Sequence, residues 1–319
     1  MHRPNTFIVG APKCGTTALA QYLAEHPQVF FSDPKEPFFW SADYKGLADQ
    51  HALGTLDDYL ALFQKAGEQH RVVAEGSTNT LRSDCAVERI VAFDPRARFV
   101  AMLRDPVDVA HAFHMEQVYV LNEDEPDFET AWRMQDRRAQ GHAIPRACRA
   151  PQFLQYGAIG RYGEQVENLL RHVSRDAVLF IRFEDFRDDP ARIYRQTLAF
   201  LGLDDDRRSE FPVVNASHRH RSRLVASMVL DPPALLKVPV WRLRTHLRRA
   251  RYPLIEKIKS HLRQPSRRAA LTPELRAEMR AYFHDDLLKL ERLLGWDLRS
   301  WREGDEATDS LAPSARRFA

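Results

Sequence analysis

Residues 6–17 read Thr-Phe-Ile-Val-Gly-Ala-Pro-Lys-Cys-Gly-Thr-Thr and decide the fold. The apolar run 6–9 predicts a buried strand, because β-branched and aromatic residues favour strands. Residues 10–15 hold two glycines and a proline, which predict a tight loop, and a helical pattern follows to about residue 26. A loop between a strand and a helix N-terminus directs free backbone N–H groups at one point. The sequence therefore predicts an anion site directly after the first strand.

The lysine of this loop does not stand where a nucleotide-binding P-loop has it. Gly10 and Gly15 keep the G-x-x-x-x-G spacing, but Thr16 follows where a P-loop has lysine. The only lysine of the loop is Lys13. Without a lysine after the second glycine a γ-phosphate contact is lost, so phosphate binding is expected and ordinary ATP chemistry is disfavoured. A plain strand–turn–helix corner is the alternative interpretation.

Composition places the chain among globular proteins. Its 319 residues are 44% hydrophobic and include three cysteines, too few for a disulfide framework. No apolar run approaches the roughly 18–20 residues that span a bilayer, and the first strand follows the N-terminus too closely for a signal peptide. We expect a cytoplasmic location.

Strands alternate with helices along most of the chain. Apolar runs predict strands at 6–9, 29–31, 72–75, 98–103 and 178–183, and helical patterns lie between them. This order is typical of the α/β class, here a P-loop-like three-layer fold with a central parallel sheet and helices on both faces. The loops 10–15, 32–37, 75–78 and 104–106 leave strand ends and can converge on one site.

One domain is expected over residues 1–302. Within it, residues 209–271 form a basic, irregular lid or insert, and residues 303–319 form a polar tail. Three of the predicted helices are 128–140, 159–173 and the segment that begins at Pro273.

Five motifs together resemble the sulfotransferases that use 3′-phosphoadenosine 5′-phosphosulfate (PAPS), in their bacterial and carbohydrate-sulfating branch. The motifs are Pro-Lys-Cys-Gly-Thr-Thr at 12–17, Lys-Glu-Pro-x-Phe at 35–39, Arg-Phe-Val-Ala-Met-Leu-Arg-Asp-Pro-Val-Asp at 98–108, Phe-Ile-Arg-Phe-Glu-Asp-Phe at 180–186, and Leu-Leu-Gly-Trp-Asp-Leu-x-x-Trp at 293–301. The resemblance covers nearly the whole chain and implies sulfuryl transfer from PAPS to a hydroxyl group.

The resemblance implies a set of donor-binding residues. Lys13 would stabilise charge on the leaving 5′-phosphate, and Arg104, at a strand end, would hold the 3′-phosphate. The family's serine eight residues after that arginine is Ala112 here. The remaining residues expected to bind PAPS are Cys14, Gly15, Thr16, Thr17, Arg219 and Arg221. An ion pair with Asp105 or Asp108 is the structural alternative for Arg104.

The acceptor hydroxyl needs a general base, and Glu36 is the first candidate, because the carbohydrate-sulfating relatives have a glutamate at the matching place. His111 and His114 are held in reserve. Lys35, Phe39 and Glu75 are expected to bind the substrate, a glycan, a lipid or a small metabolite. No metal is expected, since no Cys/His spacing fits one.

A basic segment at 241–268 allows several interpretations. It is a solvated surface, or a peripheral contact with anionic substrate or membrane headgroups; no motif supports nucleic-acid binding. Two other functions stay open at this point: a P-loop kinase of a small alcohol, and a non-catalytic protein that binds polyanions or membranes. The oligomeric state is not readable from the sequence.

Overall fold

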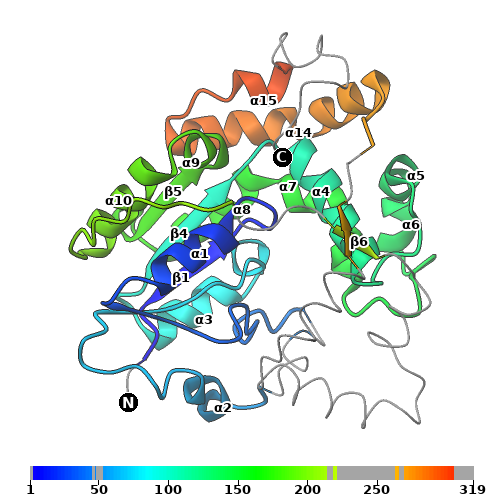
Figure 1. Ribbon diagram of the computed structural model, residues 1–319. Helices are drawn as coiled ribbons and strands as arrows, with labels where there is room; N and C mark the ends of the chain where they lie inside the picture. The colour runs from blue at the N-terminus through cyan, green and yellow to red at the C-terminus, as the bar shows by residue number, and fades with distance from the viewer. Residues whose placement is uncertain are drawn as a thin grey trace. The chain divides into compact units, whose positions relative to one another are not determined.

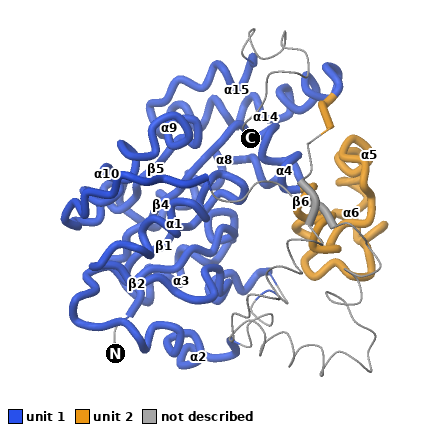
Figure 2. Tube along the Cα trace, viewed as in Figure 1, with its two compact units in different colours: residues 1–113, 155–215, 272–319 blue, residues 114–154, 216–271 orange. Residues whose placement is uncertain are grey.

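The computed structural model describes residues 3–44, 47, 53–213, 218–220, 263–265 and 269–304. The chain divides into two compact units (Figure 2): residues 1–113, 155–215 and 272–319 form unit 1, and residues 114–154 and 216–271 form unit 2. The expected single domain over 1–302 stays a prediction. None of the described helices is long and apolar enough to cross a membrane.

Unit 1 is built on a parallel sheet of five strands (Figure 1), which confirms the predicted fold class. The order in the sheet is β2-β3-β1-β4-β5. The strands are β1 (Thr6–Gly10), β2 (Val29–Phe31), β3 (Val72–Glu75), β4 (Arg98–Leu103) and β5 (Val178–Arg182). All residues of β1 and β3 are buried, and β4 is exposed only at its first residue. Burial on both faces explains why these strands read as continuous apolar runs.

Helices cover both faces of the sheet because the chain moves through it in two directions. From β1 it crosses by α1 (Thr16–Ala24) to β2, and from β3 it crosses back by α3 (Ala86–Phe93) to β4. Right-handed crossovers in opposite directions place their helices on opposite faces. The next crossover helix, α8 (Tyr162–His172), contacts α3, as the same direction of travel requires.

The strand order reverses at β1, which lies between β3 and β4. Ligands of open α/β sheets bind at such a switch point, outside the carboxyl ends of the strands. The loop after β1 therefore occupies the expected position for a binding site.

The remaining elements of unit 1 support this sheet. They are α2 (Leu56–Ala61), η2 (Thr80–Arg82), α4 (Pro106–Tyr119, which continues past residue 113), α7 (Tyr156–Gly160), η4 (Arg175–Ala177), α9 (Phe183–Asp188), α10 (Pro190–Leu201), α14 (Pro273–Leu294) and α15 (Arg299–Glu303). As predicted, α14 begins at Pro273; Thr272 caps it by accepting a hydrogen bond from the N–H of Leu275.

Two of the predicted helices are interrupted. The helix expected over 159–173 is α7 followed by α8, with a non-helical residue, Arg161, between them. The new start is capped from a distant helix: the carboxylate of Asp286 in α14 accepts the N–H groups of Gly163 and Glu164 at 2.7 and 3.0 Å. The helix expected over 128–140 tightens at Met134, where ψ is −7°, and becomes two short helices.

Unit 2 contains those two helices, α5 (Phe128–Arg133) and α6 (Gln135–Ala139), with η3 (Pro151–Leu154). Two short antiparallel strands, β6 (His218–His220) and β7 (Arg263–Pro265), lie in the segment expected to be irregular. A fully buried ion pair joins Arg138 to Glu123 with contacts of 2.6 and 2.7 Å. Glu123 also accepts two backbone N–H groups, so this pair fixes the turn before α5.

Candidate functional site: a phosphate loop beside a lysine–glutamate pair

The loop after β1 contains two residues with a positive φ, Gly15 and Lys13. Gly15 has φ of 83°, and a Cβ there would lie 3.1 Å from Cδ2 of Phe183, so glycine suits both the conformation and the space. Lys13 also has a positive φ, 63°, and is half-buried. Helix α1 starts at Thr16, directly after Gly15, which has no side chain to cap it. The N–H of Ala18 bonds back to the carbonyl of Gly15 at 3.0 Å, so the N–H groups that the first turn presents to an anion are those of Thr16 and Thr17.

These features fit the 5′ end of PAPS. Helix α1 has nine residues, and no side chain caps its N-terminus. A phosphate needs such a free helix end, together with a glycine that lets the backbone approach closely. Thr16 and Thr17 add hydroxyl groups on the same turn, and Lys13 adds a positive charge within the loop.

Cys14 anchors the phosphate loop, residues 10–15, to the interior of the protein. Its side chain is completely buried; Sγ donates to the carbonyl of Pro12 at 3.4 Å and lies 3.9 Å from the hydroxyl of Tyr162. Burial raises the pKa of the Cys14 thiol to about 12. The thiol is therefore neutral, and its contacts are with groups inside the protein. Cys14 can bind an anion only through its backbone N–H.

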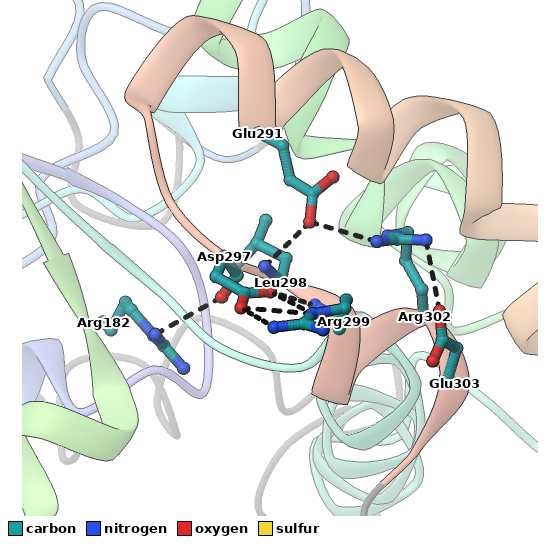
Figure 3. A network of polar contacts seen from close by, with 7 residues as sticks. All are labelled: Arg182, Glu291, Asp297, Leu298, Arg299, Arg302 and Glu303. Carbon is teal, nitrogen blue, oxygen red and sulfur yellow. Dashed lines mark hydrogen bonds and ion pairs between the residues drawn. The ribbon is translucent and has the colours of Figure 1, made fainter.

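The closing motif of the chain contacts the same support. Trp301 is buried and meets the ring of Tyr162 edge-on, with 6.4 Å between the ring centroids. Figure 3 shows the polar network that holds this segment: Glu291 accepts the N–H of Leu298 at 2.8 Å and pairs with Arg302 at 3.4 Å. At the end of β5, Arg182 donates to the carbonyl of Asp297 at 3.5 Å.

Arg104 lies at the carboxyl end of β4, as predicted. It pairs with Asp108 at 2.7 Å, stacks over the ring of Phe183 at 4.7 Å, and its side chain is 12% exposed. Burial acts to lower the pKa of Arg104, but the nearby carboxylate of Asp108 outweighs it and the pKa is raised. The ion pair named as the structural alternative is thus present. It uses one of the five N–H donors of the guanidinium group.

Lys35 and Glu36 form the second half of the site. The ammonium of Lys35 contacts Glu36 Oε1 at 2.9 Å and the carbonyl of Gly76 at 3.2 Å, and it lies 3.5 Å from the hydroxyl of Thr16. The hydroxyl of Thr78 donates to Glu36 Oε2 at 3.1 Å. These contacts join three strand ends, those of β1, β2 and β3, and they place the Glu36 carboxylate next to the phosphate loop.

Glu75, the last residue of β3, is 1% exposed. One carboxylate oxygen accepts the N–H of Ser77 at 2.8 Å, and the other, Oε1, has no hydrogen-bond partner within the described part of the chain. Burial is the main reason that the pKa of Glu75 rises to about 7; the hydrogen bonds from Ser77 oppose the rise, and the charge of Glu36 adds to it. Glu75 is thus a buried proton-binding group behind the Lys35–Glu36 pair.

Three more of the residues predicted for the site are Phe39, His111 and His114. The ring of Phe39 stacks on Tyr59 with centroids 4.6 Å apart, which occupies one of its faces. His111 is buried on α4. His114 belongs to unit 2, where Nε2 lies 2.9 Å from the carbonyl oxygen of Glu125 and burial lowers its pKa.

Several of the predicted residues lie where the structure describes little or nothing. For Arg219 only the backbone in β6 is described, and Arg221 lies outside the described residues. The same holds for the basic segment 241–268 except residues 263–265. No group of three metal-binding side chains gathers among the residues that the structure describes, and independence from metal stays a prediction.

Four residues that the sequence did not predict also contribute to the site. Thr78 holds Glu36, Tyr162 supports Cys14, and Phe183 lies under both Gly15 and Arg104. The fourth, Ser77, accepts the N–H of Phe38 at 3.0 Å and fixes the loop after β2. The position of residues 77 and 78 directly after a core strand was the available signal.

Fold and site together define a P-loop-like α/β protein with a lysine inside its phosphate loop. The chain belongs to the sulfotransferase domain family, whose model matches residues 3–218. A sulfotransferase from Alicyclobacillus acidocaldarius has a similar structure, with a TM-score of 0.69 and 27% identity over 95% of this chain and 100% of that one.

Two curated relatives are similar over part of their length. Carbohydrate sulfotransferase 15 of Mus musculus is 27% identical over 255 residues, covering 63% of this chain and 44% of that protein. The bifunctional heparan sulfate N-deacetylase/N-sulfotransferase 4 of Mus musculus is 25% identical over 210 residues, covering 63% of this chain and 22% of that protein. The chain thus spans less than half the length of either relative.

Proposed function

We propose that the protein transfers the sulfuryl group of PAPS to a hydroxyl group of a carbohydrate acceptor. The observation that carries this proposal is the Lys35 bridge, which brings the carboxylate of Glu36 beside the phosphate loop. A base next to an anion cradle is the arrangement that transfer from a phosphate-bound donor to an alcohol requires. When bound, PAPS supplies the activated sulfuryl group.

The donor-side residues bind charge. The first-turn N–H groups and hydroxyls of Thr16 and Thr17, with the backbone of Cys14 and Gly15, would hold the 5′-phosphate. Lys13 supplies a positive charge for the phosphate oxygen at which negative charge develops. Arg104 has guanidinium donors for the 3′-phosphate beyond the one that Asp108 occupies. Arg219 and Arg221 are proposed as further donor contacts on the grounds of the sequence resemblance.

The acceptor-side residue that moves a proton is Glu36. Both of its oxygens are already oriented, one by Lys35 and one by Thr78, and a carboxylate retains lone pairs for an acceptor O–H. The proton of the hydroxyl would pass to Glu36 as the hydroxyl oxygen attacks the sulfur, while the bond from the sulfur to the 5′-phosphate breaks and PAP leaves. His111 is the reserve base. Glu75 and Phe39 are proposed to contribute to binding of the acceptor.

A carbohydrate is favoured as acceptor because two relatives are named for carbohydrate or heparan sulfate. A lipid or small-metabolite hydroxyl is the alternative that an acceptor screen separates. A cytoplasmic location and a peripheral membrane contact through residues 241–268 are also proposals.

Calorimetric titration with 3′-phosphoadenosine 5′-phosphate (PAP), followed by transfer of labelled sulfate to an acceptor panel, tests the proposal. Lys13→Ala and Glu36→Gln should each lower transfer by 100-fold or more, in the range typical for electrostatic and acid–base contributions of about 10² to 10⁴. Only Lys13→Ala should also weaken PAP binding. Lys65→Ala, at an exposed lysine, is the matched control. Absence of PAP binding at millimolar nucleotide, or magnesium-dependent ATP turnover, would contradict the assignment.

A further inference from the structure

We infer that Lys35 contacts the sulfuryl group during transfer and so acts as a second catalytic cation, in addition to holding Glu36. This rests on the proposed function, and it assigns to Lys35 the transferred group itself as its ligand. The contact would stabilise negative charge on the sulfuryl oxygens from the acceptor side of the site.

The contacts of the Lys35 ammonium carry the inference. An ammonium has three N–H donors, and its three acceptors are at 2.9 Å on Glu36, 3.2 Å on Gly76 and 3.5 Å on Thr16. The first two are ordinary hydrogen bonds. The third, to the hydroxyl of Thr16 at the first position of α1, directly after the phosphate loop, is at the outer limit of hydrogen-bond length. The donor that faces the phosphate loop is therefore the one most easily exchanged for a ligand oxygen.

The position of this donor follows from what transfer requires. The group being transferred must lie between the phosphate held by the loop and the hydroxyl oxygen held by Glu36. Lys35 contacts one residue on each side of that gap: Thr16, at the start of α1, and Glu36, the proposed base. An anionic group that bridges the two sides therefore lies within reach of the ammonium, whose side chain is only 21% exposed. Low exposure to water strengthens such a charge contact.

The backbone around Lys35 fixes this direction. Its carbonyl accepts the N–H of Gly76 at 2.9 Å and the hydroxyl of Ser32 at 3.4 Å. The side chain then passes over Gly76, where a Cβ would lie 3.2 Å from Lys35 Cε and 3.3 Å from Cζ of Phe31. A glycine at position 76 leaves the path that the lysine uses toward the loop.

A purely structural role of Lys35 predicts a different result from a contact with the sulfuryl group. If Lys35 only anchors the loop after β2 to Gly76, its loss disturbs the site for every nucleotide alike. If Lys35 contacts the sulfuryl group, its loss weakens binding of PAPS, which carries that group, more than binding of PAP, which lacks it. The ratio of the two dissociation constants separates these roles without any turnover.

The experiment measures both dissociation constants by calorimetry without acceptor, for the wild type and Lys35→Gln. We expect Lys35→Gln to weaken PAPS binding by about 10- to 100-fold, the effect of losing one hydrogen bond to a charged group, and PAP binding by less than about threefold. Lys65→Gln is the matched control at an exposed lysine and should change neither. Gly76→Ala, which keeps every charge but crowds the path of Lys35, should give the same selective loss to a smaller degree.

Equal losses for PAPS and PAP, or no loss for either, would overturn the role of Lys35 while leaving the proposed function in place. A wild type that binds neither nucleotide would overturn the proposed function itself. If Lys35→Gln does not fold, Gly76→Ala decides the matter by the same ratio.

Discussion

Replacing Glu75 by glutamine should remove a large part of the pH dependence of stability. In the folded protein the pKa of Glu75 is raised from 4.5 to about 7, mainly by burial. Well below pH 4.5 this residue is protonated in both states. As the pH rises toward 7 the unfolded chain loses the proton first, so the folded state binds more protons and the free energy of unfolding falls. Above about pH 7 both states are ionised and the loss is complete.

The size of this loss follows from the two pKa values. At about 1.4 kcal/mol for each pH unit between them, the ionised Glu75 lowers the free energy of unfolding by about 3 kcal/mol above pH 7, relative to pH 4. The buried oxygen that lacks a hydrogen-bond partner in the described residues is the structural reason, because no contact offsets its desolvation.

Urea-induced unfolding at pH 5 and at pH 8 gives the free energy of unfolding at each pH. The effect is the difference between these two free energies. The wild type should lose about 2.5 kcal/mol more than Glu75→Gln does over this interval, because part of the loss has already occurred at pH 5. Glu68→Gln, at an exposed acid, should behave as the wild type. Comparing differences removes the contribution of other titrating groups, such as Asp105, whose pKa burial also raises. An identical pH dependence in wild type and Glu75→Gln would refute the reasoning.

Three further outcomes are expected. Glu123→Gln should cost about 3–5 kcal/mol of stability, because Arg138 is left charged and buried; in scanning calorimetry the double variant with Arg138→Met should recover part of it, and a melting temperature equal to that of the wild type would speak against the pair. Gly15→Ala should weaken PAP binding, because a left-handed φ of 83° costs an L-residue about 1–2 kcal/mol and its Cβ would crowd Phe183; an unchanged dissociation constant would disprove this. Cys14 should resist iodoacetamide at pH 8 in the folded protein and react in urea, as mass spectrometry can show, because its buried thiol has a pKa of about 12; labelling of the folded protein at Cys14 would contradict its burial.

The centre of the sheet could be predicted from the sequence because β1, β3 and β4 are buried on both faces. β4, for example, has the bounds expected from the apolar run 98–103. The start of α8 could not, because the groups that cap Gly163 and Glu164 come from Asp286, 123 residues after Gly163. Local periodicity carries no information about a cap supplied by another helix.

The site divides in the same way. Lys13, Glu36 and Arg104 stand at strand ends, where topology alone predicts that ligands bind. The bridge from Lys35 to Thr16 depends on a side-chain direction set by Gly76. Thr78 is a single polar residue in a turn, and only the three-dimensional structure shows that it holds Glu36.

The support of the phosphate loop has a consequence for the order in which the protein is made. The loop is complete once residue 15 has been synthesised, yet Cys14 packs against Tyr162, and Tyr162 packs against Trp301. On a ribosome the loop is therefore translated long before the residues beneath it exist. Its native surroundings form only after the closing motif has left the exit tunnel, so the support beneath the loop is assembled late in synthesis.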